Sequence, residues 1–205
     1  MKIIANNQIF EFEQNRNNEN FYFTDFLLAL LKVPNEYVIW PYGIDKQMSE
    51  RVFAYELYHQ WRLIANQFNY ENLLINGEIR KDGSVLRNNF NDIVYPDLIL
   101  HEQQNNLNQQ KIACEIKTVK SINSSNGKFN VKKDLKKLGK YITELQFETG
   151  IFIQIGNHFN EFSETIRYLK KNEAEFTNSD KIYYVIKDHA SIKFETLENL
   201  LNANA

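Results

Sequence analysis

Residues 111–119 read KIACEIKTV, an apolar run interrupted by one acid and one base. Apolar and β-branched residues at this density are typical of a strand in a protein core. Side chains two apart on a strand share a face, so Glu115 and Lys117 are expected to project to one side and Ile116 to the other. Charged side chains on a buried strand are costly, which favours a functional reason for their presence.

A second stretch, residues 96–101 with the sequence PDLILH, also predicts a strand. The polar run 103–110, QQNNLNQQ, lies between the two stretches and is typical of a hairpin loop. Pairing of the two strands would bring Asp97 beside Glu115. Taken alone, an aspartate after a proline also fits a turn, and an acid and a lysine two apart also fit a solvated edge strand. The apolar flanks favour a buried site.

The rest of the chain predicts alternating helices and strands, with apolar residues at three- and four-residue intervals in the helices. Residues 1–45, with a strand pair within 3–12 and a helix over 23–31, are interpreted as an N-terminal elaboration, and residues 46–205 as the main domain. The expected fold is α/β with a mixed central sheet flanked by helices. The main domain is predicted to contain helices 47–68, 131–147, 162–170 and 197–201 and strands 73–79, 96–101, 111–119, 151–155 and 181–186.

Composition excludes several classes of protein. The chain has 205 residues, 43% of them hydrophobic, and a formal net charge of −2, so a polyanion would have to meet a local basic patch. The single cysteine, Cys114, excludes an intramolecular disulfide. The apolar run 26–31 is far shorter than the roughly 20 residues of a membrane helix. A cytoplasmic protein without a membrane partner is expected, and no phosphate-binding, dinucleotide-binding or serine-hydrolase glycine motif is present.

Two carboxylates brought together repel each other, and a hard cation such as Mg²⁺ relieves that repulsion while binding phosphate oxygens. Such a metal lowers the pKa of a bound water and stabilises charge that develops on a phosphate. A lysine beside the metal places a positive charge against the water or the phosphate. Asp97, Glu115 and Lys117 together therefore predict hydrolysis of phosphodiester bonds.

The pattern Pro96-Asp97 followed by Glu115-Ile116-Lys117 resembles that of the PD-(D/E)xK nuclease superfamily, which includes restriction endonucleases and Holliday-junction resolvases. The resemblance covers about residues 47–156, where the expected order of elements matches the αβββαβ core of the family. It implies a restriction endonuclease-like fold and a DNA endonuclease of prokaryotic defence or repair. It also implies Mg²⁺, with Mn²⁺ as a substitute, held by Asp97 and Glu115, with Lys117 as the catalytic lysine of the motif.

Many members of the superfamily add a glutamate from the first core helix, and residues 50–56, ERVFAYE, offer two. Glu50 lies on the same helical stripe as the apolar residues of the helix, and Glu-Arg before apolar residues is similar to the first helix of resolvase-type nucleases. Glu56 lies on a flank of that stripe. Glu50 is favoured as the metal-side acid, and Glu56 remains the alternative. Tyr55 and Tyr58 are interpreted as helix packing.

A lysine-rich segment surrounds the second core helix and offers a local basic patch. In the superfamily that this chain resembles, this helix follows the catalytic strand. The resemblance thus implies that its lysines meet phosphates beside the cleaved bond. A solvated helix face is the ordinary alternative. The proposed nucleic-acid contacts are Lys120, Lys128, Lys132, Lys133 and Lys136, joined on the same helix by Lys137 and Lys140.

Several questions stay open at this level. DNA is the expected substrate and RNA the alternative, and a homodimer would suit symmetric cutting of two strands. A nuclease-like fold that binds nucleic acid or a protein without cleaving it is the main competing function, because fold does not dictate function. An interaction protein that uses its aromatic N-terminal segment is a third interpretation.

Gln154, late on the strand 151–155, is a further site residue that the resemblance implies.

Overall fold

A computed structural model describes residues 2–5, 8–11, 21–38, 50–70, 72–77, 96–102, 109–122, 126–156, 159–188 and 191–203. The helices in these ranges are α1 (Phe21–Lys32), α2 (Glu50–Phe68), α3 (Val119–Ile122), α4 (Gly127–Leu145), α5 (Phe159–Lys170) and α6 (Leu197–Asn202), with single 3-10 turns at Asn35–Tyr37, Glu173–Glu175 and Ser179–Lys181. The strands are β1 (Lys2–Ala5), β2 (Gln8–Glu11), β3 (Leu74–Gly77), β4 (Leu98–His101), β5 (Gln110–Thr118), β6 (Thr149–Ile155), β7 (Ile182–Lys187) and β8 (Ile192–Thr196).

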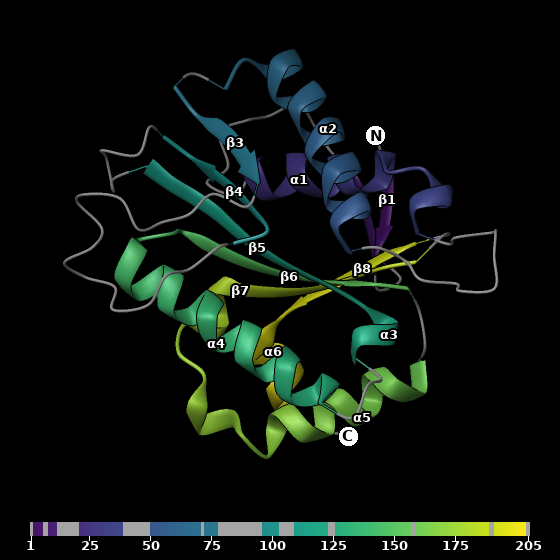
Figure 1. Cartoon of the computed structure of the whole chain (residues 1–205), viewed down its shortest axis with the longest axis vertical. Coiled ribbons are helices and arrows are strands. Elements are labelled where there is room, and N and C mark those ends of the chain that lie inside the picture. Colours follow the sequence, from purple (N-terminus) through teal and green to yellow (C-terminus); the bar gives the residue numbers. More distant parts are fainter. Residues whose placement is uncertain are drawn as a thin grey trace.

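Six strands form one mixed sheet in the order β3-β4-β5-β6-β7-β8. The first three pair as an antiparallel meander, β5, β6 and β7 are parallel, and β8 returns antiparallel to β7. The parallel step from β5 to β6 needs a crossover, which α4 provides (Figure 1). The strands β1 and β2 form a separate antiparallel pair.

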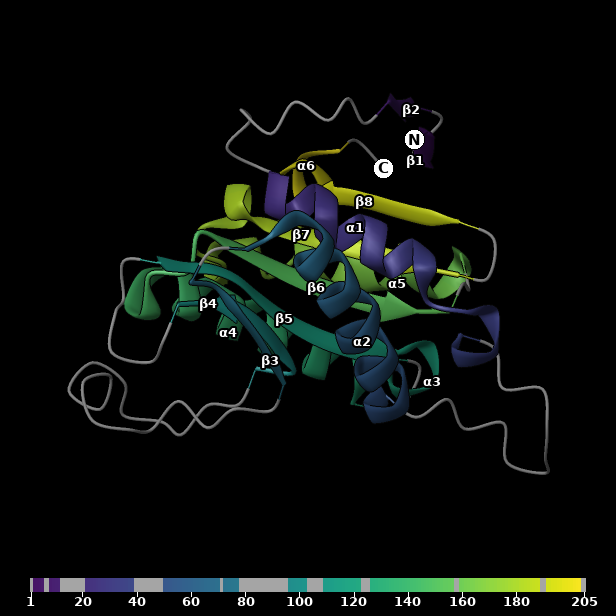
Figure 2. The ribbon, with the colours of Figure 1, turned by 90° about the horizontal axis from the view of Figure 1, so that it is seen from above.

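Helices cover both faces of the sheet, with α1 and α2 on one side and α4, α5 and α6 on the other (Figure 1). Figure 2 shows α1 and α2 crossing the same face. The alternation along β5 explains the two cores, because Cys114 and Ile116 pack with α1 and α2, whereas Ala113 packs with α4. The result is a three-layer α/β/α arrangement, and it confirms the predicted α/β class with a mixed sheet.

The amphipathic helix expected over 47–68 is α2, whose residues Phe53, Leu57, Trp61 and Ile64 are all fully buried. Helix α1 packs in the same core, where Phe26 meets Trp61 edge-on with ring centroids 4.9 Å apart. The domain boundary predicted at residues 45 and 46 falls outside the described residues, so it stays a prediction.

Helix α4 buries the predicted leucine stripe but begins at Gly127, earlier in the chain than expected. On this helix, Gly139 lies close to Thr177. A Cβ at position 139 would be 2.8 Å from the backbone oxygen of Thr177. Strand β8 and helix α3 were not expected from the sequence. The strand β8 lies at the sheet edge and most of its side chains are half-buried, so its apolar alternation is weak. Within the described residues, none of the helices has the length and apolarity to cross a membrane.

Candidate active site

The candidate site lies where β5 continues past the beginning of β4. Leu98, the first residue of β4, pairs with Cys114, and the preceding Asp97 N–H donates to the Cys114 carbonyl at 3.0 Å. Beyond this point, no described strand flanks β5 on the β4 side. There, two carboxylates accept backbone hydrogen bonds that a neighbouring strand would otherwise accept. The Ile116 N–H donates to Asp97 Oδ2 at 2.7 Å, and the Thr118 N–H donates to Glu50 Oε1 at 3.2 Å.

Asp97 and Glu115 face each other across the two strands. The antiparallel register that pairs Leu98 with Cys114 places them opposite one another, on the face that α4 covers. The pKa of Asp97 is raised, first by burial and further by the charges of Asp134 and Glu50, although the Ile116 N–H and Lys117 oppose the shift. The predicted juxtaposition of Asp97 and Glu115 on neighbouring strands is thus present.

Glu115 is the most deeply buried acid of the site, with a side chain that is 3% exposed. The Tyr141 hydroxyl donates to Glu115 Oε1 at 3.0 Å, and Lys137 Nζ lies 3.7 Å from the same oxygen. Burial raises the pKa of Glu115 to about 8, and the charges of Asp97 and Asp134 add to the shift. Its surroundings therefore favour the protonated form of this carboxyl group.

Lys117 is held among three oxygen atoms from three elements. Its Nζ donates to the Ile116 carbonyl at 3.1 Å and lies 3.5 Å from both Glu50 Oε2 and Asp134 Oδ2. Burial alone would lower the pKa of Lys117, but the surrounding acids, Asp134 first, raise it above its usual value. The ammonium group is therefore charged and fixed in position.

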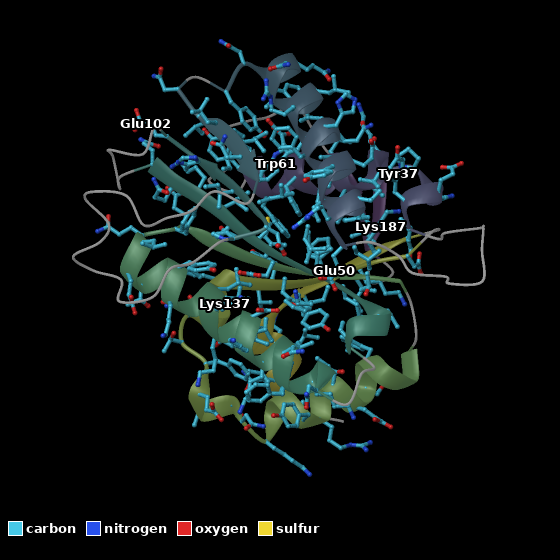
Figure 3. All side chains as sticks on the ribbon, viewed as in Figure 1. Tyr37, Glu50, Trp61, Glu102, Lys137 and Lys187 are labelled. Carbon is cyan, nitrogen blue, oxygen red and sulfur yellow. The ribbon has the colours of Figure 1, made fainter. Side chains whose placement is uncertain are left out.

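Asp134, on α4, is a site residue that the sequence reasoning missed. Its Oδ1 pairs with Lys137 Nζ at 2.8 Å, and its buried Oδ2 has no hydrogen-bond partner among the described residues. A signal was available, because Asp134 lies four residues before Leu138 and seven before Tyr141, on the buried face of the helix. Figure 3 shows Glu50 at the end of α2 nearest the sheet and Lys137 on α4. We call Glu50, Asp97, Glu115, Lys117, Asp134 and Lys137 the acid–lysine cluster.

The structure distinguishes the two helical glutamates. Glu50, the first residue of α2, contacts Lys117 and the backbone of β5. Glu56 lies further along the helix, where its Oε1 accepts a hydrogen bond from Gln60 Nε2 at 2.7 Å. Of the two, Glu50 is therefore the one brought to Lys117.

The lysines proposed to contact nucleic acid separate into two groups. Lys128 pairs with Glu164 at 2.6 Å, and both Lys132 and Lys136 pair with Glu175, at 3.0 and 2.9 Å. These three lysines thus pair with acids of α5 and of the 3-10 turn Glu173–Glu175, outside the acid–lysine cluster. The second group is Lys133, Lys137 and Lys140, at spacings of four and three that place them on one stripe, with Lys137 reaching Glu115. The side chain of Lys120 lies outside the described residues.

Gln154 extends the site across β6. It is paired in register with Lys117 on the neighbouring parallel strand, and its side chain is buried. The Tyr184 hydroxyl donates to Gln154 Oε1 at 2.7 Å, which fixes the amide. The residue implied by the resemblance thus lies beside Lys117.

The acid–lysine cluster has four carboxyl and two ammonium groups, which leaves a formal charge of −2 when all are ionised. A divalent cation would balance that charge. In the described part of the chain, however, no three His, Cys, Asp or Glu side chains form a group that could hold a metal ion. A cation held by the described carboxylates would therefore need water or substrate oxygens as further ligands, as Mg²⁺ sites often do. Neither a protein-family model, nor a curated protein, nor a solved structure matches this chain.

Proposed function

We propose that this protein is a metal-dependent nuclease of the PD-(D/E)xK type that hydrolyses phosphodiester bonds in DNA. One observation carries the proposal: Asp97 and Glu115 face each other from adjacent strands, and Lys117 follows on the same face of β5, in contact with Glu50. The chemistry expected from the sequence needs these groups together.

The order of elements supports the same proposal. In the described residues, and apart from the four-residue helix α3 between β5 and α4, the segment from α2 to β6 runs helix, three antiparallel strands, helix and parallel strand. This is the αβββαβ order that the resemblance to the superfamily implies. The proposed restriction endonuclease-like core therefore spans Glu50–Ile155.

Asp97 and Glu115 would hold the cation, Mg²⁺ or Mn²⁺, with Glu50 close by. When bound, the metal supplies a water of lowered pKa and stabilises negative charge on the phosphate. The raised pKa of Glu115, about 8, supports this assignment, because burial first, and then the charges of Asp97 and Asp134, disfavour an ionised carboxyl group that a cation would stabilise.

The side chains around the metal position have distinct roles in the proposal. Lys117, fixed between Glu50 and Asp134, provides a constant positive charge toward the attacking water or the phosphate. Tyr141 holds one oxygen of Glu115 and so sets the orientation of its carboxyl group. These side chains are fixed before substrate arrives, which reduces the reorganisation that the reaction requires.

A binding module without cleavage is the second candidate function. Two observations favour it: the Lys117 ammonium is already engaged by Glu50 and Asp134, and the described acids form no group of three that could hold a metal. Such a protein would bind nucleic acid or a partner through the same surface, and the charges would serve only to stabilise the fold.

The test is cleavage of labelled DNA and RNA by the purified chain with Mg²⁺, with Mn²⁺ and with EDTA. We expect metal-dependent cleavage of DNA and a loss of at least about 100-fold in Lys117→Met. Lys111→Met is the matched control, because Lys111 lies on the same strand but pairs with Glu148 away from the cluster. Wild-type protein that leaves both substrates intact, or Lys117→Met that cleaves like wild type, would refute the proposal.

A second matched pair tests the helical acid. Glu50→Gln and Glu56→Gln make the same change on the same helix, but only Glu50 contacts Lys117 and β5. We expect Glu50→Gln to lower the cleavage rate and Glu56→Gln to leave it unchanged. Equal losses in the two variants would remove Glu50 from the proposed site.

A further inference from the structure

A cavity of about 510 Å³ lies directly beside the acid–lysine cluster. Glu50 and Asp97 form part of its wall, together with residues of α2 and the end of β3. The volume is within the range of sites that enclose a small molecule or one building block of a polymer. A ligand in this cavity would therefore touch the same two carboxylates that the proposed reaction uses.

Two tyrosines of α2 form the aromatic part of the wall. Tyr55 is 60% exposed and lines the cavity, so most of its surface is available for contact with a ligand. Tyr58 is held in place, because its hydroxyl accepts a hydrogen bond from Arg62 Nη1 at 2.8 Å and the Arg62 guanidinium lies 5.7 Å from the ring centre. The sequence-based interpretation of Tyr55 as helix packing does not account for this exposure.

Polar groups complete the wall with Arg51 and Asn76. The side chain of Asn76 is fixed by buried His101, whose Nε2 donates to Asn76 Oδ1 at 2.8 Å. The amide N–H groups of Asn76 are donors that match the ring nitrogens and carbonyl oxygens of nucleobases. Arg51 also lines the cavity, and an arginine at this place suits a phosphate.

We propose that this cavity binds the base of one unpaired nucleotide next to the scissile phosphate, with Tyr55 as the stacking surface. The inference rests on the proposed nuclease function and narrows its substrate to DNA that is single-stranded or unpaired near the cut. Aromatic rings bind bases of any sequence by stacking, and amide donors recognise base edges. A base inside a duplex is stacked and paired, so it could enter this half-open cavity only after leaving the helical stack, which costs free energy.

The test measures binding without cleavage. Wild-type chain in EDTA is titrated into a fluorescent single-stranded oligonucleotide and into a blunt duplex of the same sequence, and anisotropy gives the two Kd values. We expect Tyr55→Ala to weaken single-strand binding about tenfold and to leave duplex binding unchanged. Tyr55→Phe, which keeps the stacking ring, should bind like wild type. Leu63→Ala is the matched control, since Leu63 is 49% exposed on the same helix and does not line the cavity.

The outcomes separate the two proposals. Unchanged single-strand binding by Tyr55→Ala, or an equal loss for single strand and duplex, overturns the cavity assignment even when the wild-type chain cleaves DNA with Mg²⁺. Absence of cleavage by the wild-type chain overturns the nuclease proposal, whatever Tyr55→Ala does to binding. Tyr55→Leu, which preserves helix packing but not stacking, should reproduce the loss seen with Tyr55→Ala, and wild-type binding by Tyr55→Leu would also overturn the assignment.

Discussion

The Asp97 carboxylate accepts a hydrogen bond from the backbone N–H of Ile116 at 2.7 Å. Asp97 is therefore both a proposed metal ligand and the partner of a backbone group that no described strand satisfies. The two roles respond differently to substitution, because an asparagine keeps an acceptor oxygen and loses the charge, whereas an alanine loses both.

We expect Asp97→Asn to keep nearly wild-type stability and to lose cleavage. Asp97→Ala should also lose cleavage, and it should be less stable than Asp97→Asn by about 1–3 kcal/mol because the Ile116 N–H is left unsatisfied. Urea unfolding and cleavage rates measured on the same preparations would separate the two effects. Equal stability of the two variants would contradict the structural role of the carboxylate.

The burial of Glu115 predicts a pH-dependent stability in metal-free protein. Its pKa is raised from 4.5 to about 8, so the folded state binds an extra proton between these values and the unfolded state does not. The free energy of unfolding should therefore fall as pH rises through this interval, by a few kcal/mol at most. Glu115→Gln should remove most of the slope and be more stable than wild type at about pH 9, where the wild-type carboxyl group is ionised.

Mg²⁺ should counteract that fall, because it competes with the proton for the same carboxylate. The increase in the urea midpoint on addition of Mg²⁺ should be larger at about pH 8 than at about pH 6 for wild type and should be absent in Glu115→Gln. An equal Mg²⁺ effect at both pH values, or an effect that persists in Glu115→Gln, would place the cation elsewhere.

Asp134 is expected to raise the pKa of Lys117. Among the acids that raise the pKa of Lys117, Asp134 has the largest effect, so Asp134→Asn should lower that pKa. If the reaction uses the Lys117 ammonium group, the alkaline limb of the cleavage profile should move to lower pH in this variant. Asp180→Asn is the control, because Asp180 lies on a separate turn, away from the acid–lysine cluster. A uniform loss of rate without a change in the profile would contradict this role.

The two groups of α4 lysines should differ in their salt dependence. Lys133 and Lys140 lie on the stripe that leads to the site, whereas Lys128 and Lys136 are paired with glutamates. Replacing Lys133 or Lys140 by alanine should reduce the slope of log Kd against log salt by about one for each phosphate that the variant no longer neutralises. Lys128→Ala and Lys136→Ala should change the slope less, and equal effects at all four positions would refute the division.

Replacing Gly139 by alanine should reduce stability, although helix propensity alone would predict a gain. Alanine normally favours a helix over glycine, but at this position its Cβ would lie 2.8 Å from the Thr177 carbonyl oxygen. We expect Gly139→Ala to destabilise the protein by about 1–3 kcal/mol in urea unfolding. Lys140→Ala, on the exposed side of the same turn, is the control. A Gly139→Ala variant as stable as wild type would show that the Thr177 segment can move aside.

The sequence was sufficient to predict the elements that carry the site. Alternation along residues 111–119 predicted the shared face of Glu115 and Lys117, and the short polar connection predicted the hairpin partner that supplies Asp97. Local periodicity and proximity along the chain determine both features, so both can be inferred from a single sequence.

The remaining site residues depend on contacts between segments distant in the chain. Helical periodicity placed Asp134 near the buried face of α4, but only the packing of α4 on β5 brings it to Lys117. Likewise, Glu175 neutralises Lys132 and Lys136 from about 40 residues away, which no local pattern reveals. Tyr55 was misinterpreted because its residue type is common in cores, although it lies off the buried stripe of α2.

The part of β5 that continues past β4 also affects what relatives of this protein would retain during evolution. Asp97 and Glu50 satisfy backbone N–H groups of Ile116 and Thr118, so selection for stability alone would preserve them in a lineage that had lost its activity. Glu115 is different, because its ionised form is disfavoured where it lies and a neutral residue would suit the fold better. Under the proposed function, persistence of Glu115, rather than of the other two acids, is thus the mark expected of a lineage that cleaves its substrate.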